Sequence, residues 1–185
     1  MKKVLRKLIL SDKTRDQKAN SNVLHKRLSN VKSILHNEHQ DDVGLEKILR
    51  LFLASSQFAF PGIYIKQLCS YRGIHIQELA IDVYILVKIL FPFYLLYFNL
   101  ELNPIIISIL AWLLLETILY ISTLVFASDL FDQPRSYRRS MLLLFMDYFQ
   151  IVLSYAVLYK TGEHLNKPLT HWFDPIYFSV VTSAT

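Results

Sequence analysis

Residues 104–127, PIIISILAWLLLETILYISTLVFA, decide the fold class of this chain. Across this stretch the only charged side chain is Glu116. The hydrocarbon core of a bilayer is about 30 Å thick, and about 20 apolar residues in a helix cross it. The stretch is therefore predicted to be a transmembrane helix.

Two further stretches, residues 80–100 and 141–159, meet the same requirement. The whole chain of 185 residues is 53% hydrophobic, with a mean hydropathy of +0.31, which is more apolar than an ordinary soluble domain. Residues 80–100 are linked to the stretch 104–127 only by residues 101–104. These two stretches are therefore predicted to form an antiparallel hairpin. The expected fold class is an all-α integral membrane protein with three transmembrane helices.

The basic residues predict the orientation of these helices. Residues 1–79 contain 14 of the 20 Lys and Arg residues against 7 acids, and residues 128–140 carry Arg135, Arg138 and Arg139. Basic residues beside membrane ends mark the cytoplasmic side. We expect a basic, helical cytoplasmic segment (1–79), a transmembrane hairpin (80–127), a cytoplasmic loop (128–140) and an outward-running third helix in a multi-pass protein of the cell membrane.

Residues 45–65 are apolar enough to raise the question of a fourth span. Arg50, the polar residues 55–57 and the pair Pro61-Gly62 interrupt them. A fourth span would also move the three loop arginines outside. We therefore predict an interfacial helix near residues 45–60.

The first 40 residues are predicted to form short amphipathic helices. A 4-3-4 spacing places four apolar residues on one helical face: Leu24, Leu28, Val31 and Leu35. This face could pair subunits or lie on lipid, but so short a repeat favours packing against neighbouring helices.

The extreme N-terminus is predicted to contact anionic lipid, because apolar side chains alternate there with Lys2, Lys3, Arg6 and Lys7. Nucleic-acid binding is not expected, since no basic stripe with stacking aromatic residues is present.

Two charges fall inside the predicted spans. Lys88 and Glu116 lie at depths that differ by roughly 4 to 5 Å, so an ion pair across the hairpin is feasible. A pair that locks the hairpin is the favoured interpretation, and a gating or proton-sensing site is the alternative. We expect Asp82 and Asp147 nearer the cytoplasmic surface, solvated or paired with the loop arginines.

Enzyme chemistry is not predicted. The six histidines are scattered, no metal-ligand spacing occurs, and the chain has only four glycines. Cys69 is the only cysteine, so an internal disulfide is impossible. No catalytic residue, metal or cofactor is expected.

The last twelve residues, 174–185, predict a second kind of membrane helix. Asp174 suits an N-cap and Pro175 the first helical turn. The ten residues that follow the cap give a helix of roughly 15 Å, about half the thickness of the hydrocarbon core. Such a helix must be re-entrant, interfacial or packed inside protein.

Residues 177–185, Tyr-Phe-Ser-Val-Val-Thr-Ser-Ala-Thr, resemble the pore helix of the two-transmembrane potassium-channel family. That pattern has two aromatic residues, a serine, two variable residues, a threonine, two more residues and the first threonine of the selectivity filter. The family has a threonine where this chain has Ala184.

The resemblance implies that residues 141–185 form an outer helix, an extracellular turret and a re-entrant pore helix. Thr185 would be the first filter residue and bind the ion, and four residues would support the filter: Tyr177, Phe178, Ser179 and Thr182. It also implies a homotetramer that conducts potassium ions passively. The charge-derived orientation agrees, because a pore helix enters from the extracellular side after an inside-to-outside helix.

Two other functions compete with a channel. One is a membrane-anchored adaptor or regulatory subunit without channel activity, whose residues 1–79 bind a cytoplasmic partner. The other is a small membrane enzyme or transporter that uses Lys88 and Glu116, although no catalytic motif supports it.

We expect this chain to be a truncated fragment that does not conduct, because the family's filter continues past its first threonine with Val or Ile, then Gly-Tyr-Gly, and an inner helix. Purified protein in liposomes should show no potassium flux, and the coding DNA beyond codon 185 should encode the missing filter. Robust flux would contradict the expectation, and unrelated downstream sequence would favour the adaptor.

Overall fold

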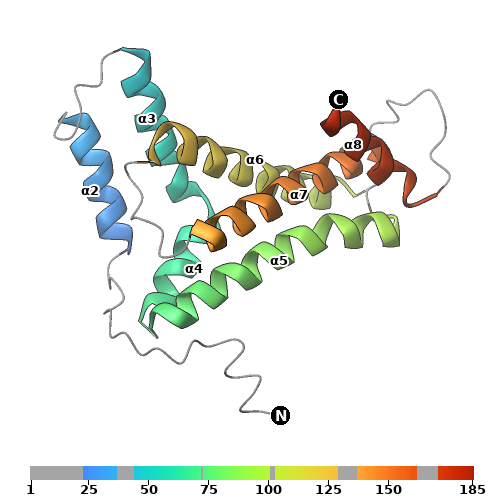
Figure 1. The fold of residues 1–185 in the computed structure, drawn as a ribbon, viewed down its shortest axis with the longest axis horizontal. Helices are drawn as coiled ribbons and strands as arrows, with labels where there is room; N and C mark the ends of the chain where they lie inside the picture. The colour runs from blue at the N-terminus through green and yellow to red at the C-terminus, as the bar shows by residue number, and fades with distance from the viewer. Residues whose placement is uncertain (1–22, 37–43, 72, 101–102, 129–136, 162–170) are drawn as a thin grey trace, which may run out of the picture. The chain divides into compact units, whose positions relative to one another are not determined.

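The computed structural model describes residues 23–36, 44–71, 73–100, 103–128, 137–161 and 171–185 (Figure 1). Every regular element in these ranges is a helix, which confirms the predicted all-α class. The chain divides into two compact units, residues 1–83 and 84–185. The basic N-terminal cluster and most of the 128–140 loop lie outside the described residues.

Three helices are long and apolar enough to cross a membrane: α5 (Ile74–Phe98), α6 (Pro104–Phe126) and α7 (Tyr137–Thr161). The chain is therefore a multi-pass membrane protein, and the three predicted spans are confirmed as helices. Both α5 and α7 begin several residues before the predicted starts at 80 and 141. Apolarity marks the part of a helix suited to the bilayer, whereas the helical hydrogen bonds continue into more polar sequence at either end.

In the first unit, α2 (Val23–Leu35) packs on α3 (Leu45–Ser56) and α4 (Pro61–Ser70). Side chains from these neighbours satisfy both ends of α2. The Gln67 side-chain oxygen accepts hydrogen bonds from the backbone N–H groups of Val23 (2.7 Å) and Leu24 (3.3 Å). Lys47 Nζ donates to the carbonyl oxygen of Leu35 at 3.1 Å. Backbone N–H and C=O groups at the ends of α2, which have no partner within the helix, thus form hydrogen bonds with side chains of α3 and α4.

The packed face of α2 is not the predicted one. Val23 and Ile34 are buried, whereas Leu28 is 63% and Leu35 57% exposed. The buried face of α2 is therefore the one that carries Val23 and Ile34. Helical spacing alone identified an apolar stripe but not the side on which the neighbours lie.

The segment predicted as an interfacial helix near 45–60 forms α3, followed by the short 3₁₀ helix η1 (Gln57–Ala59). Pro61 then starts α4, which the sequence did not predict, at an angle of 66°. A proline has no N–H to donate within the preceding helix but fits a first helical turn. If α3, η1 and α4 are counted together as one broken span, they give a fourth membrane crossing. The interfacial location of this segment stays a prediction.

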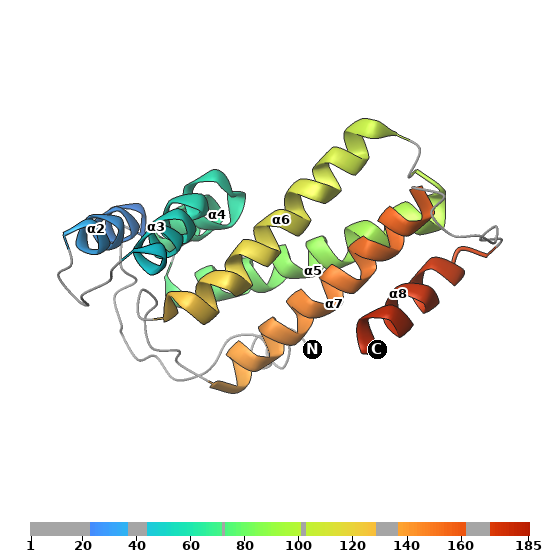
Figure 2. The ribbon, with the colours of Figure 1, turned by 90° about the horizontal axis from the view of Figure 1, so that it is seen from above.

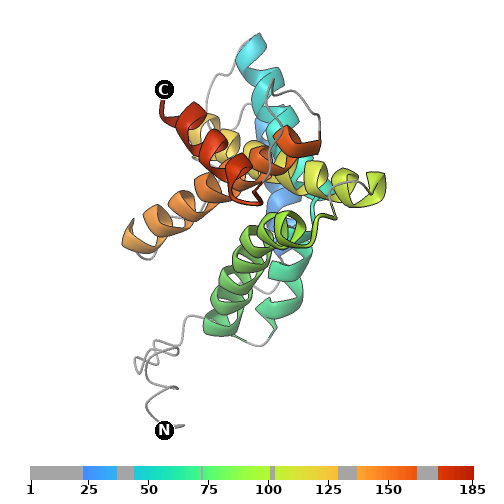
Figure 3. The same ribbon diagram turned by 90° about the vertical axis from the view of Figure 1, so that its right-hand side faces the viewer.

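The second unit has an apolar core to which all four of its helices contribute. The short helix α8 (Asp174–Ala184) lies against α7 in every view (Figures 1, 2 and 3). Its Ile176 joins a buried cluster that comprises Leu95, Leu96, Leu110, Leu153, Ala156 and Val157. The N-cap of α8 is Phe173, one residue before the predicted cap Asp174, which is the first residue of the helix. The Asp174 carboxylate accepts a hydrogen bond from the His171 N–H at 2.9 Å.

The turn between α5 and α6 is built as its residue types predict. Asn103 caps α6 by accepting a hydrogen bond from the Ile105 N–H at 3.0 Å. Asn99 ends α5 with φ of 52°, a left-handed conformation that asparagine tolerates better than most residues. Its side-chain oxygen accepts a 2.6 Å hydrogen bond from Lys160, which joins the end of α5 to the end of α7.

Replacing Ile176 by Ala should lower the free energy of unfolding by about 2 kcal/mol or more, because a buried side chain leaves a cavity. The matched control is Ile105→Ala, an identical change at a side chain that is 70% exposed, which should have little effect. Detergent unfolding of the purified protein followed by circular dichroism measures both. Equal effects would contradict the packing of α8 on the core.

Candidate functional site

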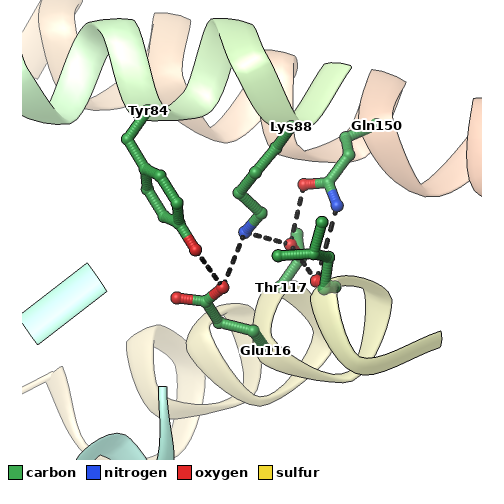
Figure 4. A network of polar contacts seen from close by, with 6 residues as sticks. Tyr84, Lys88, Glu116, Thr117 and Gln150 are labelled. Carbon is green, nitrogen blue, oxygen red and sulfur yellow. Dashed lines mark hydrogen bonds and ion pairs between the residues drawn. The ribbon is translucent and has the colours of Figure 1, made fainter. Parts of the chain in front are cut away.

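Five polar side chains meet inside the second unit, and we call them the polar layer. They come from three helices: Tyr84 and Lys88 from α5, Glu116 and Thr117 from α6, and Gln150 from α7 (Figure 4). The layer lies within the apolar segments suited to cross the membrane. Polar groups at such a depth are costly unless they find partners within the protein.

Lys88 is at the centre of the layer. Its Nζ lies 3.5 Å from Glu116 Oε2 and donates a 2.6 Å hydrogen bond to Thr117 Oγ1. Only 5% of Lys88 and 7% of Glu116 are exposed. The structure thus brings together the two intramembrane charges named from the sequence, as a buried ion pair between the helices of the hairpin.

Neutral groups complete the polar layer on both sides of this pair. The Tyr84 hydroxyl donates to Glu116 Oε2 at 2.6 Å, which gives the carboxylate a second donor (Figure 4). On the other side, the Thr117 hydroxyl lies 2.7 Å from Gln150 Oε1 and 3.0 Å from the Leu113 carbonyl, so its single proton serves two acceptors. Gln150 Nε2 donates to the same carbonyl at 3.4 Å.

The connected bonds join α5, α6 and α7 at one level. In a low-dielectric interior such bonds are stronger than in water, but an unsatisfied member is correspondingly costly. The same level is marked in α5 by Pro92, which has no N–H and cannot donate to the carbonyl of Lys88 one turn earlier.

Asp147 is buried beside the polar layer, so the expectation that its side chain is solvated is wrong. Its exposed fraction is 3%, and its Oδ2 is buried without a hydrogen-bond donor among the described residues. Because α7 begins at Tyr137, Asp147 lies roughly 15 Å along the helix. Lys88 and Glu116 both act on it electrostatically.

Sequence reasoning missed Tyr84, Thr117 and Gln150 as members of the layer. A signal was present, because Tyr84 and Lys88 are four residues apart and therefore share a helical face. In α7, three buried polar residues also follow a 3-4 spacing: Asp147, Gln150 and Ser154. A polar stripe in an apolar helix of this kind indicates a face turned toward protein.

The residues expected to support a filter lie on different faces of α8. Ser179 is buried, and its hydroxyl donates to the Val152 carbonyl of α7 at 2.6 Å. The Phe178 ring meets that of Tyr159 edge to face, with 5.1 Å between centroids. Tyr177, Thr182 and Thr185 are exposed, and the two threonine hydroxyls donate to carbonyls of α8 itself.

The direction of α8 is defined by these contacts. It starts near the end of α7 and runs back along it (Figure 2). The Tyr148 hydroxyl lies 3.5 Å from the Ser183 carbonyl, so the end of α8 is level with the middle of α7. The helix therefore covers about half the length of its neighbour.

No protein family, curated protein or solved structure matches this chain. What it does must therefore be argued from its own residues.

Replacing Thr117 by Val should lower the free energy of unfolding by about 1 to 2 kcal/mol, because Lys88 loses an acceptor and Gln150 a donor in a membrane interior. The matched control is Thr123→Val in the same helix. Thr123 is equally buried, and its hydroxyl donates to the Leu119 carbonyl within α6. Detergent unfolding measures both, and equal losses would show that the polar layer adds nothing to stability.

Proposed function

We propose that the chain is a potassium-channel-like membrane subunit, in which α7 is the outer helix and α8 the pore helix. One observation carries the proposal: α8 folds back along a membrane-spanning helix and ends beside its middle. In the proposed channel, α8 ends at this depth, and its last carbonyl groups then have no helical partners. A channel is a setting in which those carbonyls meet a cation rather than lipid.

The electrostatics of a helix end fit this role. The C-terminal end of a helix carries a partial negative charge. Four copies of α8 around one axis would direct these ends at a shared cavity and favour a cation there. In this arrangement Thr185, which follows α8, begins the filter, where oxygen atoms replace the hydration shell of potassium.

The two faces of α8 support a homotetramer. The face with Ile176 and Ser179 packs on the subunit's own core and on α7. The other face exposes Tyr177, Val180 and Val181. In the proposed tetramer this exposed face contacts the neighbouring subunit, and Tyr177 and Thr182 support the filter from there.

The proposed orientation follows from charge. In the proposed orientation the N-terminal segment is cytoplasmic, because its excess of basic residues favours that side of the cell membrane, and α8 enters from the extracellular side. The proposed subunit is not an enzyme and needs no cofactor, and potassium is the transported ion.

A fusion protein that contains the whole chain tests the proposed roles of α7 and α8. Residues 1–185 are joined at Thr185 to the remaining filter residues and the inner helix of a tetrameric potassium channel. If α7 and α8 have the proposed roles, the fusion in liposomes should form tetramers and conduct potassium in preference to sodium. A fusion that inserts into the membrane but neither assembles nor conducts would overturn the proposal and favour an adaptor.

A matched pair of variants tests the filter support within this fusion. Thr182 and Ser183 are adjacent and exposed, and their side-chain hydroxyls donate to carbonyls of their own helix at 2.8 and 2.9 Å. Thr182→Val should reduce potassium selectivity several-fold, because Thr182 is the position that matches the family pattern, and Ser183→Ala should not. Flux measurements with the two ions give the selectivity, and equal effects would remove the role assigned to Thr182.

A further inference from the structure

The buried charges around the polar layer do not balance. One base, Lys88, is accompanied by two acids, Glu116 and Asp147, and none of the three is more than 7% exposed. With all three ionised, this part of the bundle would carry one net negative charge. An uncompensated charge inside a protein at membrane depth is energetically costly.

The two acids differ in what surrounds them. Glu116 Oε2 has Lys88 Nζ at 3.5 Å and the Tyr84 hydroxyl at 2.6 Å, and both stabilise its ionised form. Asp147 Oδ2 is buried without a donor among the described residues. Ionised Asp147 is therefore the less stabilised of the two carboxylates.

We propose that Asp147 is an intramembrane proton-binding site, occupied by a proton at neutral pH. One carboxylate oxygen takes up a proton from water and forms an O–H bond, and no other bond changes. The layer then contains one base and one ionised acid and is neutral. Asp147 Oδ2 has no hydrogen-bond partner among the described residues, and an unpaired neutral carboxyl group costs less to bury than an unpaired carboxylate.

The neighbouring elements specify the charges involved. Among the described residues, Lys88 from α5 and Glu116 from α6 are the charged groups that act on Asp147. The titratable groups described in α8, Asp174 and Tyr177, are not among those that act on it. A proton fits this site better than a metal ion does. The described residues contain no group of three His, Cys, Asp or Glu side chains able to hold a metal ion.

Loss or gain of this proton would change the charge beside the Lys88–Glu116 ion pair, which joins α5 to α6. A membrane protein can use such a carboxylate to sense pH or to pass protons. The proposal does not rest on potassium conduction, and its test requires no ion flux.

Infrared spectroscopy of the whole protein in liposomes tests the proposal, because a protonated carboxyl group has a C=O stretch distinct from that of a carboxylate. The wild type at neutral pH should show this band, and ¹³C labelling of the aspartate side-chain carboxyls should shift it. Asp147→Asn should remove the band, and the control Asp82→Asn in α5 should keep it. A wild type without the band, or a band that persists in Asp147→Asn, would overturn the proposal.

Charge balance supplies a second and sharper expectation. In Glu116→Gln the ionised form of Asp147 becomes the counter-ion of Lys88, so the band should disappear although Asp147 is still present. In Lys88→Met the last base is lost, so the band should increase about two-fold as Glu116 also takes a proton. A band unchanged in both variants would contradict a shared charge balance.

Carbodiimide labelling checks the wild type without any substitution. Dicyclohexylcarbodiimide enters membranes and reacts with protonated carboxyl groups, adding the carboxyl oxygen and its hydrogen across one C=N bond. Mass spectrometry of the labelled peptides should place the modification on Asp147 and not on Glu116. Labelling on Glu116 instead would assign the proton to the wrong acid and overturn the proposal.

Discussion

The cost of placing Lys88 in an apolar bundle constrains the second unit more than any other single interaction. An ammonium group at membrane depth must find a counter-charge and hydrogen-bond acceptors inside the protein. Glu116 and Thr117 supply these, and both lie on α6, so α5 and α6 are held in one register. Thr117 then contacts Gln150, which extends the same constraint to α7.

The apolar core and the polar layer lie at different levels of these helices and have different effects on the fold. Toward the turn between α5 and α6, Leu96, Leu110 and Val157 are buried in the apolar core. Their packing stabilises the bundle, but apolar contacts alone do not fix the register of the helices. Farther along, hydrogen bonds between unlike groups select one register among many that apolar packing would tolerate. The short helix α8 joins the core through Ile176, so its position depends on a framework that the polar layer aligns.

Much of the fold could be predicted because bilayer thickness and helix geometry are strong constraints. They identified α5, α6 and α7, and Asn103 and Pro104 marked the turn between two of them. Lys88 and Glu116 could be named because charges are rare in such stretches. Asp147 was expected to be solvated or paired with the loop arginines, because its burial depends on how α7 packs against α5 and α6.

The sequence alone determined that this chain has three helices suited to cross a membrane and where those helices lie. Each of these follows from local composition and the fixed rise of a helix. Only the tertiary structure decided which faces meet: that Val23 and not Leu28 packs in α2, that Gln150 completes the layer, and that Asp147 is buried. Rotation about a helix axis depends on contacts distant in sequence, and those contacts exist only once the helices have packed.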